Sequence, residues 1–200
     1  MLVLFICLAS FCRAQVEANE YKIGVLAKRG RDKCLEKWTS TSEYISESVP
    51  DGRFVIVPLE FSEIIPAVKK KEVDFLIANP SFYAYLEATC GISRMVTLKN
   101  IRHDTVCTVF GGVIFTRADN RTECLDELRG KSFMAVDRTS FGGWHMAWRE
   151  LKQYGINPER NFSSLRFAGT HDAVVYAVRD REVYAGTVRS DTLERMAAEG

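Results

Sequence analysis

Three short apolar segments alternate with amphipathic segments in the first half of the sequence, and this alternation most strongly limits the possible fold. The apolar segments are YKIGVLA, RFVIVPL and VDFLIA, at residues 21–27, 53–59 and 73–78. Such short segments, apolar throughout, are typical of strands buried on both faces of a parallel sheet. Helical spacing follows each of them, over residues 31–49, 62–71 and 80–89. The pattern predicts an α/β fold.

The same order of strand and helix begins again at residue 131, after a long strand-like segment, VCTVFGGVIFTR, at residues 106–117. AVKKKEVDFLIAN at 67–79 lies over AVRDREVYAGTVR at 177–189, an offset of 110 residues. We therefore expect two similar α/β lobes, with lobe one over residues 21–117 and lobe two over residues 118–200. Residues 106–120 are the expected crossover between them.

The amino-terminal segment differs from the rest of the chain. LVLFICLASFC is an apolar run of 11 residues, too short to span a bilayer. Small residues precede a cleavage point after Ala14, so residues 1–14 are predicted to be a secretory signal peptide. A buried strand is the alternative interpretation. Export places the protein in the periplasm or elsewhere outside the cytoplasm.

Removing residues 1–14 takes away Arg13 and leaves 26 Lys+Arg against 26 Asp+Glu. A neutral domain without a basic stripe argues against nucleic acid as a partner. Export permits disulfides, but the four remaining cysteines allow three pairings, and unpaired thiols are equally consistent with the sequence. These cysteines are Cys34, Cys90, Cys107 and Cys124. Histidines and cysteines are scattered, so neither a metal site nor a cofactor is expected.

The stretch DRTSFGGWHMAW, residues 137–148, is the first candidate site. It follows the predicted strand SFMAV and opens a predicted helix. The amides at a helix start lack intrahelical partners, and they favour an anion. Adjacent hydroxyls and glycines strengthen this interpretation, so Thr139, Ser140, Phe141 and Gly142 are candidate ligand-binding residues. The alternative is that the hydroxyls only cap the helix.

Two residues of lobe two are further candidates, because ligands of open α/β sheets bind beyond the carboxyl ends of the strands. His171, in GTHDAVVYAV, is expected at a helix start, where the macrodipole favours the neutral imidazole. Thr170 or Asp172 would cap that helix. Arg189 ends the last strand and is suited to clamping an oxyanion, or to a salt bridge with Asp191 or Glu194.

The strand ends of lobe one supply the remaining candidates. Asn79 follows the strand VDFLIA, and Pro80 is placed to begin a helix. Ser81 is a potential donor to a ligand, and Tyr83 a potential wall with a hydroxyl. Lys28 and Arg29 follow the first strand; either one could reach the ligand, or both could be solvated.

Six motifs in this order resemble the periplasmic binding proteins related to the phosphonate-binding protein of ABC importers. The motifs are IGVLAKRG, VPLEFSEIIPAVKKKEVDFLIANPSFY, GGVIFTRAD, LRGKSFMAVDRTSFGGWHMAWRELK, GTHDAVVYAV and AGTVRSDTLERM. Within that group they resemble the sensor region of tetrathionate-sensor-type histidine kinases. The resemblance spans residues 21–200. It implies a type II periplasmic-binding-protein-like fold, with mixed sheets flanked by helices and two lobes that close on a ligand.

The resemblance also implies roles for particular residues. The hydroxyl-rich anion loop of the family corresponds to Thr139–Gly143, and its binding histidine and tyrosine correspond to His171 and Tyr83. Phe141 and Gly142 interrupt the hydroxyls here, and Tyr184 stands where the family often has Asp. The family's chain returns to lobe one after lobe two, and residue 200 falls before that return, so we expect a longer protein.

The resulting functional hypothesis is an extracytoplasmic sensor domain that captures a small oxyanion. The ligand is expected to be a sulfur oxyanion such as tetrathionate, or a phosphonate or phosphite. Lobe closure would signal to a membrane-anchored histidine kinase; delivery to the permease of an ABC importer is the alternative. A hydrolase using Ser140, His171 and Asp137 is a third hypothesis, which the absence of a GxSxG motif disfavours. A pure interaction module is the fourth.

Overall fold

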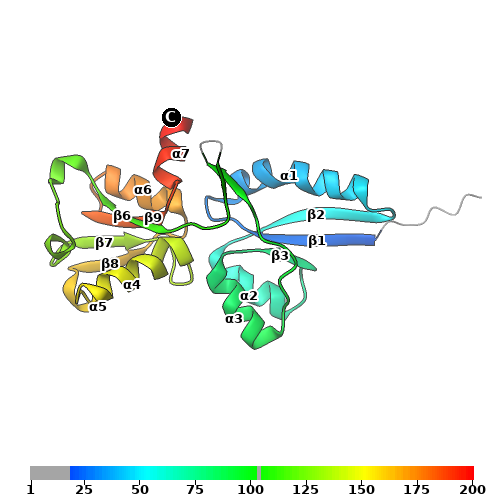
Figure 1. The fold of residues 1–200 in the computed structure, drawn as a ribbon, viewed down its shortest axis with the longest axis horizontal. Helices are drawn as coiled ribbons and strands as arrows, with labels where there is room; N and C mark the ends of the chain where they lie inside the picture. The colour runs from blue at the N-terminus through cyan, green and yellow to red at the C-terminus, as the bar shows by residue number, and fades with distance from the viewer. Residues whose placement is uncertain (1–18, 103–104) are drawn as a thin grey trace, which may run out of the picture.

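The computed structural model describes residues 19–102 and 105–200. They form two lobes that lie side by side along the long axis of the molecule (Figure 1). The predicted signal peptide, residues 1–14, lies outside the described residues. Within the described ranges, none of the helices has the length and apolar character needed to cross a membrane.

Lobe one is a three-stranded parallel sheet with helices on both faces. Its strands lie in the order β2-β1-β3, and they are β1 (Asn19–Leu26), β2 (Gly52–Leu59) and β3 (Phe75–Ile77). Its helices are α1 (Arg31–Ser48), α2 (Phe61–Lys69) and α3 (Pro80–Cys90). Residues at alternate positions of β1, Ile23 and Val25, pack against Cys34 of α1, whereas Leu26 faces α2 and α3. This alternation follows from the period of two along a strand.

Lobe two is a four-stranded mixed sheet in the order β6-β9-β7-β8. Its strands are β6 (Gly112–Thr116), β7 (Ser132–Ala135), β8 (Ser164–Phe167) and β9 (Ala185–Arg189), and β6 alone is antiparallel to its neighbour. Its helical elements are the turns η1 (Ala118–Asn120) and η2 (Leu125–Leu128), the π-helical turn η3 (Phe141–His145), α4 (Met146–Gln153), α5 (Pro158–Asn161), α6 (His171–Arg179) and α7 (Thr192–Glu199).

The two sheets share a topology. The order β2-β1-β3 of lobe one corresponds to β8-β7-β9 of lobe two, and all of these pairings are parallel. The prediction of two similar α/β lobes with flanking helices is therefore confirmed at the level of the sheets. The similarity places the carboxyl ends of β1 and β7, and those of β3 and β9, at equivalent positions in their lobes.

The prediction of one long strand over residues 106–117 is wrong. The segment instead forms β5 (Thr105–Cys107), which pairs antiparallel with β4 (Asn100–Arg102), and then β6, which pairs with β9. Residues 108–111 separate the two strands, and Gly112 begins β6. Strand β6 thus belongs to the sheet of lobe two, so the lobe boundary lies before β6 and not after residue 117. The β4–β5 hairpin lies between the lobes (Figure 1).

The apolar core is continuous across the two lobes. One cluster of buried side chains includes Leu26 and Phe82 from lobe one together with Val136 and Val174 from lobe two. Separate clusters fill the outer faces, one beneath α1 and one around Phe133 and neighbouring α4 residues. Because apolar contact joins the lobes, the loops at their strand ends are held against one another.

Candidate functional site

The loop after β1 meets the start of α6 and the end of β9. The backbone N–H of His171 donates to the carbonyl of Lys28 at 3.0 Å, and the backbone N–H of Arg189 donates to Nδ1 of His171 at 3.2 Å. His171 and Arg189 are buried, and Lys28 is half-buried. Three candidates predicted from separate motifs are therefore brought together at the contact between the lobes.

The geometry and surroundings of His171 determine its charge state. Because Nδ1 accepts the hydrogen bond from Arg189, the ring proton lies on Nε2. Burial, followed by the positive charges of Lys28 and Arg189, lowers the pKa of His171 to about 3. The imidazole is therefore neutral near pH 7, as the sequence predicted. The causes of the lowered pKa are desolvation and neighbouring cations, whereas the sequence argument invoked the helix dipole.

An aromatic wall lies beside Arg189. Its guanidinium lies 4.2 Å from the ring centroid of Phe110, and that ring meets the ring of Phe141 edge-on at a centroid distance of 5.7 Å. Arg189 Nε also lies 3.5 Å from a carboxylate oxygen of Asp191, the salt bridge that the sequence offered as an alternative. Gly142 completes the wall, since a Cβ there would lie 3.1 Å from both Arg189 and Phe110.

The segment Thr139–Gly143 is bonded mainly to itself. The hydroxyl of Ser140 accepts from the N–H of Gly143 at 3.1 Å, which is the capping role offered as the alternative. The N–H and hydroxyl of Thr139 both donate to Asp137 Oδ1, and the N–H of Ser140 donates to the carbonyl of Asp137. Three of the five amides in the segment are thus used within the loop. The remaining two, of Phe141 and Gly142, open η3, where N–H groups lack intrahelical partners.

The start of α3 lies on this loop. Asn79 caps α3 through Oδ1, and its Nδ2 donates to the carbonyl of Thr139 at 3.2 Å. The hydroxyl of Ser81 lies 2.8 Å from Nδ1 of His145, whose Nε2 lies 2.6 Å from the carbonyl of Arg138. Asn79 and Ser81 are therefore brought to residues 139–145, and His145 is a contact residue that the sequence analysis missed.

Two predicted candidates are directed elsewhere. The hydroxyl of Tyr83 donates to Glu87, one turn along its own helix. The guanidinium of Arg29 bonds Asp172 and Glu199, with nitrogen–oxygen distances of 2.6 to 3.0 Å. Both carboxylates raise the pKa of Arg29. Arg29 thus forms an ion-pair network between the lobes, in which Lys33 also bonds both carboxylates.

Asp172 is the most informative residue that sequence reasoning left without a role in the site. It was considered only as a helix cap, but the cap of α6 is Thr170, whose hydroxyl accepts from the N–H of Ala173 at 3.2 Å. The Asp172 carboxylate is therefore available to Arg29. Its position one residue after His171 was the available signal, because a charged residue beside a strand-end site residue also lies near the other lobe.

The side chains considered for a hydrolase are not connected to one another. The Ser140 hydroxyl bonds Gly143, Nδ1 of His171 bonds the Arg189 amide, and Asp137 bonds Thr139. A triad requires hydrogen bonds from serine to histidine and from histidine to the carboxylate. This arrangement therefore does not support the hydrolase hypothesis. The four described cysteines, Cys34, Cys90, Cys107 and Cys124, carry unpaired thiols.

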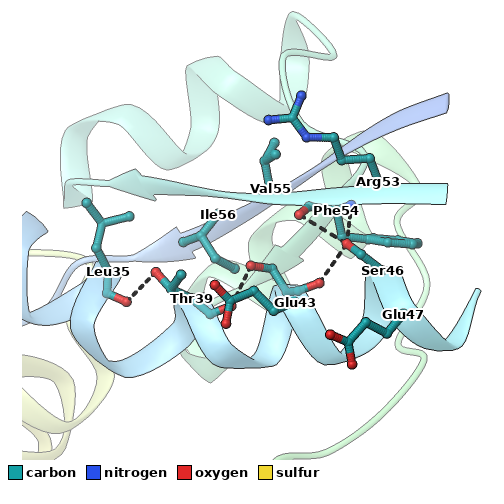
Figure 2. Close-up of a pocket in the computed structure, with 10 residues that line it drawn as sticks. Leu35, Thr39, Glu43, Ser46, Glu47, Arg53, Phe54, Val55 and Ile56 are labelled. Carbon is teal, nitrogen blue, oxygen red and sulfur yellow. Dashed lines mark hydrogen bonds between the residues drawn. The ribbon is translucent and has the colours of Figure 1, made fainter. Parts of the chain in front are cut away.

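A separate groove lies on lobe one, between α1 and the edge strand β2 (Figure 2). It has a volume of about 460 Å³, and its walls combine apolar side chains with carboxylates. The residues that line it are Leu35, Thr39, Ser42, Glu43, Ser46, Glu47, Arg53, Phe54, Val55 and Ile56. None of these ten residues is a predicted site residue, and two glutamates on its wall oppose an anion.

The chain is 34% identical over 185 residues to the tetrathionate sensor histidine kinase TtrS of Salmonella typhimurium (strain LT2), an alignment that covers 92% of this chain and 31% of the relative. The chain therefore spans about a third of the length of that curated relative.

Solved structures share the fold. PhnD1 from Prochlorococcus marinus (MIT 9301), solved in complex with methylphosphonate, has a TM-score of 0.74 at 16% identity, covering 88% of this chain and 65% of that one. A binding protein component of an ABC phosphonate transporter from Pseudomonas aeruginosa has a TM-score of 0.71 at 12% identity, covering 90% and 60%. The predicted type II periplasmic-binding-protein fold is therefore confirmed.

A family description, ABC transporter, phosphonate, periplasmic substrate-binding protein, matches residues 23–200. This family is one of substrate-binding proteins, and its periplasmic location agrees with the predicted export of the chain. Since the match covers nearly the whole described chain, the protein belongs to the family of periplasmic phosphonate-type substrate-binding proteins.

Proposed function

We propose that the described residues form an oxyanion-binding sensor domain, with the anion held where the strand-end loops of the two lobes meet. The observation that carries the proposal is the arrangement of Lys28, His171 and Arg189 at that contact. Two of these residues supply cations and the third a neutral imidazole with its proton on Nε2. Such groups complement an anion that carries more than one acceptor oxygen.

The segment Thr139–Gly143 contributes to the same site in this proposal. The N–H groups of Phe141 and Gly142 open η3, and Gly142 lies against Arg189. The hydroxyl of Ser140 retains its proton for donation while its oxygen accepts from Gly143. Peptide donors and a guanidinium on adjacent elements therefore face the same region. This combination favours compact oxyanions such as tetrathionate, thiosulfate, phosphite or a phosphonate.

A sensory role is favoured over transport. The supporting observation is the 34% identity to a tetrathionate sensor histidine kinase, against 16% and 12% identity to the phosphonate-binding structures. In this role the anion favours one arrangement of the lobes, and the membrane-anchored kinase responds to that arrangement. Occupancy is reported only if the ligand binds that arrangement more tightly than others. Delivery to an ABC permease is the second candidate function, supported by the shared fold.

A thermal-shift screen tests anion binding. The chain is heated with tetrathionate, thiosulfate, sulfite, phosphite, phosphate and methylphosphonate in turn. A cognate anion at 100 times its Kd is expected to stabilise the fold by about 2.7 kcal/mol through mass action, and the melting temperature rises accordingly. If no anion in the panel raises it, the proposed function is wrong.

Variants locate the site. Arg189→Lys and Ser140→Ala are expected to reduce the shift produced by the best anion, because they remove the guanidinium fork and the hydroxyl. Arg179→Ala is the matched control, since Arg179 is an exposed arginine at the end of α6 that pairs with Asp180. If Arg189→Lys and Ser140→Ala both bind the anion as the unmodified chain does, the site lies elsewhere.

A further inference from the structure

Lys28 stands apart from the other lysines of the lobe contact. It follows β1 directly, its carbonyl is held by the amide of His171, and its side chain is half-buried. Within residues 19–102 and 105–200, no carboxylate forms an ion pair with its ammonium group. Lys33, on the adjacent helix, differs in this respect, because its ammonium bonds both Asp172 and Glu199.

Charged side chains from several other elements act on Lys28. Arg189 of β9, Lys37 of α1 and Arg195 of α7 are cations, and Asp191 is the carboxylate that opposes them. Asp191 lies 3.5 Å from Arg189 Nε and 3.4 Å from Arg195 Nε. Neutral His171 lies against the Lys28 carbonyl. Burial and this excess of positive charge, Arg189 first, lower the pKa of Lys28 to about 7.

We propose, building on the anion-binding function above, that Lys28 contacts the captured anion as an ammonium group and that capture takes up one proton from solvent at Lys28 Nζ. The amine of Lys28 gains the proton, and no covalent bond to the anion forms or breaks. The anion adds negative charge to a cluster in which Asp191 is the carboxylate that acts on Lys28. Capture then depends on both the anion and the proton concentration.

The other groups of the cluster do not account for proton uptake near pH 8. The arginines carry their protons throughout this range. The pKa of His171, lowered to about 3 by burial and by Lys28 and Arg189, lies too far below the working pH to respond. An opposite charge close to a lysine raises its pKa. Because the pKa of Lys28 is about 7 before the anion binds, such a rise adds a proton near pH 8. Burial, followed by Arg195 and Arg189, also lowers the pKa of Lys37. Lys28, however, is the lysine whose backbone is bonded to His171 at the proposed site, so the protonation change is assigned to Lys28.

The proposal fixes the sign of the pH dependence. Below about pH 7 Lys28 is already protonated, so affinity is nearly independent of pH. Above that value the free protein must first bind a proton, so affinity falls by up to about tenfold per pH unit. A probe that stays doubly charged is required, because phosphate and phosphonates themselves titrate near pH 7. Tetrathionate and thiosulfate satisfy this condition.

Isothermal titration calorimetry of the full chain tests the proposal. Tetrathionate and thiosulfate are titrated at pH 8 in Tris and in HEPES, whose ionisation enthalpies differ, so the difference in heat gives the protons taken up. Cys90 and Cys124 are exposed thiols and attack sulfur–sulfur bonds, so they are first blocked with iodoacetamide. About 0.9 proton per bound anion is expected, because a lysine with a pKa near 7 is about one-tenth protonated at pH 8.

Variants assign the uptake to Lys28. Lys28→Met is expected to bind the anion at least tenfold more weakly and without proton uptake. Lys28→Arg is expected to bind it without proton uptake and with an affinity independent of pH from 6 to 9. Lys69→Met, at an exposed position in the last turn of α2, is expected to behave as the unmodified chain. Circular dichroism of each variant verifies folding, and Lys28→Arg remains informative if Lys28→Met unfolds.

The outcomes separate this proposal from the proposed function. Binding of an anion without proton uptake by the unmodified chain overturns the role of Lys28 and leaves anion capture intact. Undiminished uptake by folded Lys28→Arg also overturns that role. A failure of both anions to bind the unmodified chain, with the rest of the panel inert as well, overturns anion capture and this proposal together.

Discussion

Two adjacent glycines show how differently neighbouring residues are constrained. A Cβ on Gly112 would lie 2.5 Å from the carbonyl oxygen of Gly142 and 3.0 Å from Met146, whereas one on Gly111 meets nothing within 4 Å. The close approach at Gly112 lets β6 pass directly beside η3. A backbone oxygen cannot turn away as a flexible side chain can. The absence of a side chain at Gly112 is therefore a packing requirement.

Gly112→Ala is accordingly expected to lower the free energy of unfolding by about 1–3 kcal/mol, the usual cost of forcing extra atoms into a packed region. Gly111→Ala is the matched control and is expected to leave it unchanged within about 0.5 kcal/mol. Urea denaturation of both variants at pH 7 measures the difference. Equal free energies of unfolding for the two variants would show that η3 moves aside for the added Cβ without loss of stability.

His171 gives a pH dependence whose sign follows from its surroundings. Its pKa is lowered from 6.5 in the unfolded chain to about 3 by burial and by Lys28 and Arg189. Between these values the unfolded chain binds a proton at this imidazole and the folded chain does not. The free energy of unfolding therefore falls with decreasing pH from 6.5 towards 3, by at most about 1.4 kcal/mol per pH unit.

His171→Asn removes this titration while keeping an acceptor near the position of Nδ1. Its free energy of unfolding is expected to fall less steeply than that of the unmodified chain between pH 6.5 and 4.5. Urea denaturation at half-unit pH intervals gives both slopes. Parallel slopes would mean that the imidazole accepts a proton in the folded state.

At the scale of elements, helix α3 combines a local and a long-range role in one residue. Oδ1 of Asn79 accepts from the amides of Ser81 and Phe82, and Nδ2 donates to Thr139 of the other lobe. Asn79→Ala removes both interactions and is expected to cost about 1–2 kcal/mol of unfolding free energy. Asn79→Asp keeps the cap, so its expected cost is smaller, about 0.5–1.5 kcal/mol for the lost donor.

Asn157 provides the comparison for this pair of variants. It caps α5 by accepting from the amide of Glu159, and that helix lies within lobe two. Asn157→Asp is therefore expected to leave stability unchanged or slightly raised, because a carboxylate is favourable at a helix start. Chemical denaturation of all three variants is the measurement. A fully stable Asn79→Asp would show that the bond to Thr139 contributes nothing.

The sequence predicted the helices and strands of lobe one well, because the patterns that indicate them are local. Strands β1, β2 and β3 and helices α1, α2 and α3 lie within a few residues of their predicted bounds, because apolar runs and helical spacing are local signals. The segment containing β5 and β6 was predicted wrongly. Its apolar run is continuous in the sequence, and only pairing with distant strands decides where it divides.

The site was predictable only in part, for the same reason. The rule that ligands lie beyond the carboxyl ends of strands singled out Lys28, His171 and Arg189, which the structure brings together. The bond from Arg29 to Asp172 joins residues 143 apart, and that from Asn79 to Thr139 joins residues 60 apart. No local pattern specifies such pairs. They depend on how the lobes pack, which the sequence pattern leaves undetermined.

At the scale of the whole molecule, the lobes are joined by interactions of different kinds. Apolar packing continues from one lobe to the other, and polar contacts connect the start of α3 with residues 139–145. An ion-pair network connects the start of α1 with α6 and α7. Under the proposed function, lobe movement in response to a ligand would break and remake these polar contacts. The ion-pair network is therefore expected to influence how readily the lobes separate.

A double-mutant cycle on Arg29 and Asp172 tests this expectation. Their closest nitrogen–oxygen distance is 2.6 Å, and their side chains are 14% and 11% exposed. Removing one partner leaves a poorly solvated charge. The double variant to Ala is therefore expected to lose less unfolding free energy than the sum of the losses in the two single variants. The expected coupling in unfolding free energy is about 1–3 kcal/mol.

The pair Arg138–Glu159 is the matched control, because it lies within lobe two, at 3.5 Å, with side chains 65% and 60% exposed. Its coupling is expected to be at most about 0.5 kcal/mol, since water screens exposed pairs. Urea denaturation at low and high salt measures both cycles, and small-angle X-ray scattering of Asp172→Ala reports whether the lobes move apart. Equal coupling in the two cycles, with unchanged scattering, would mean that apolar packing alone holds the lobes together and that the network contributes nothing to their movement.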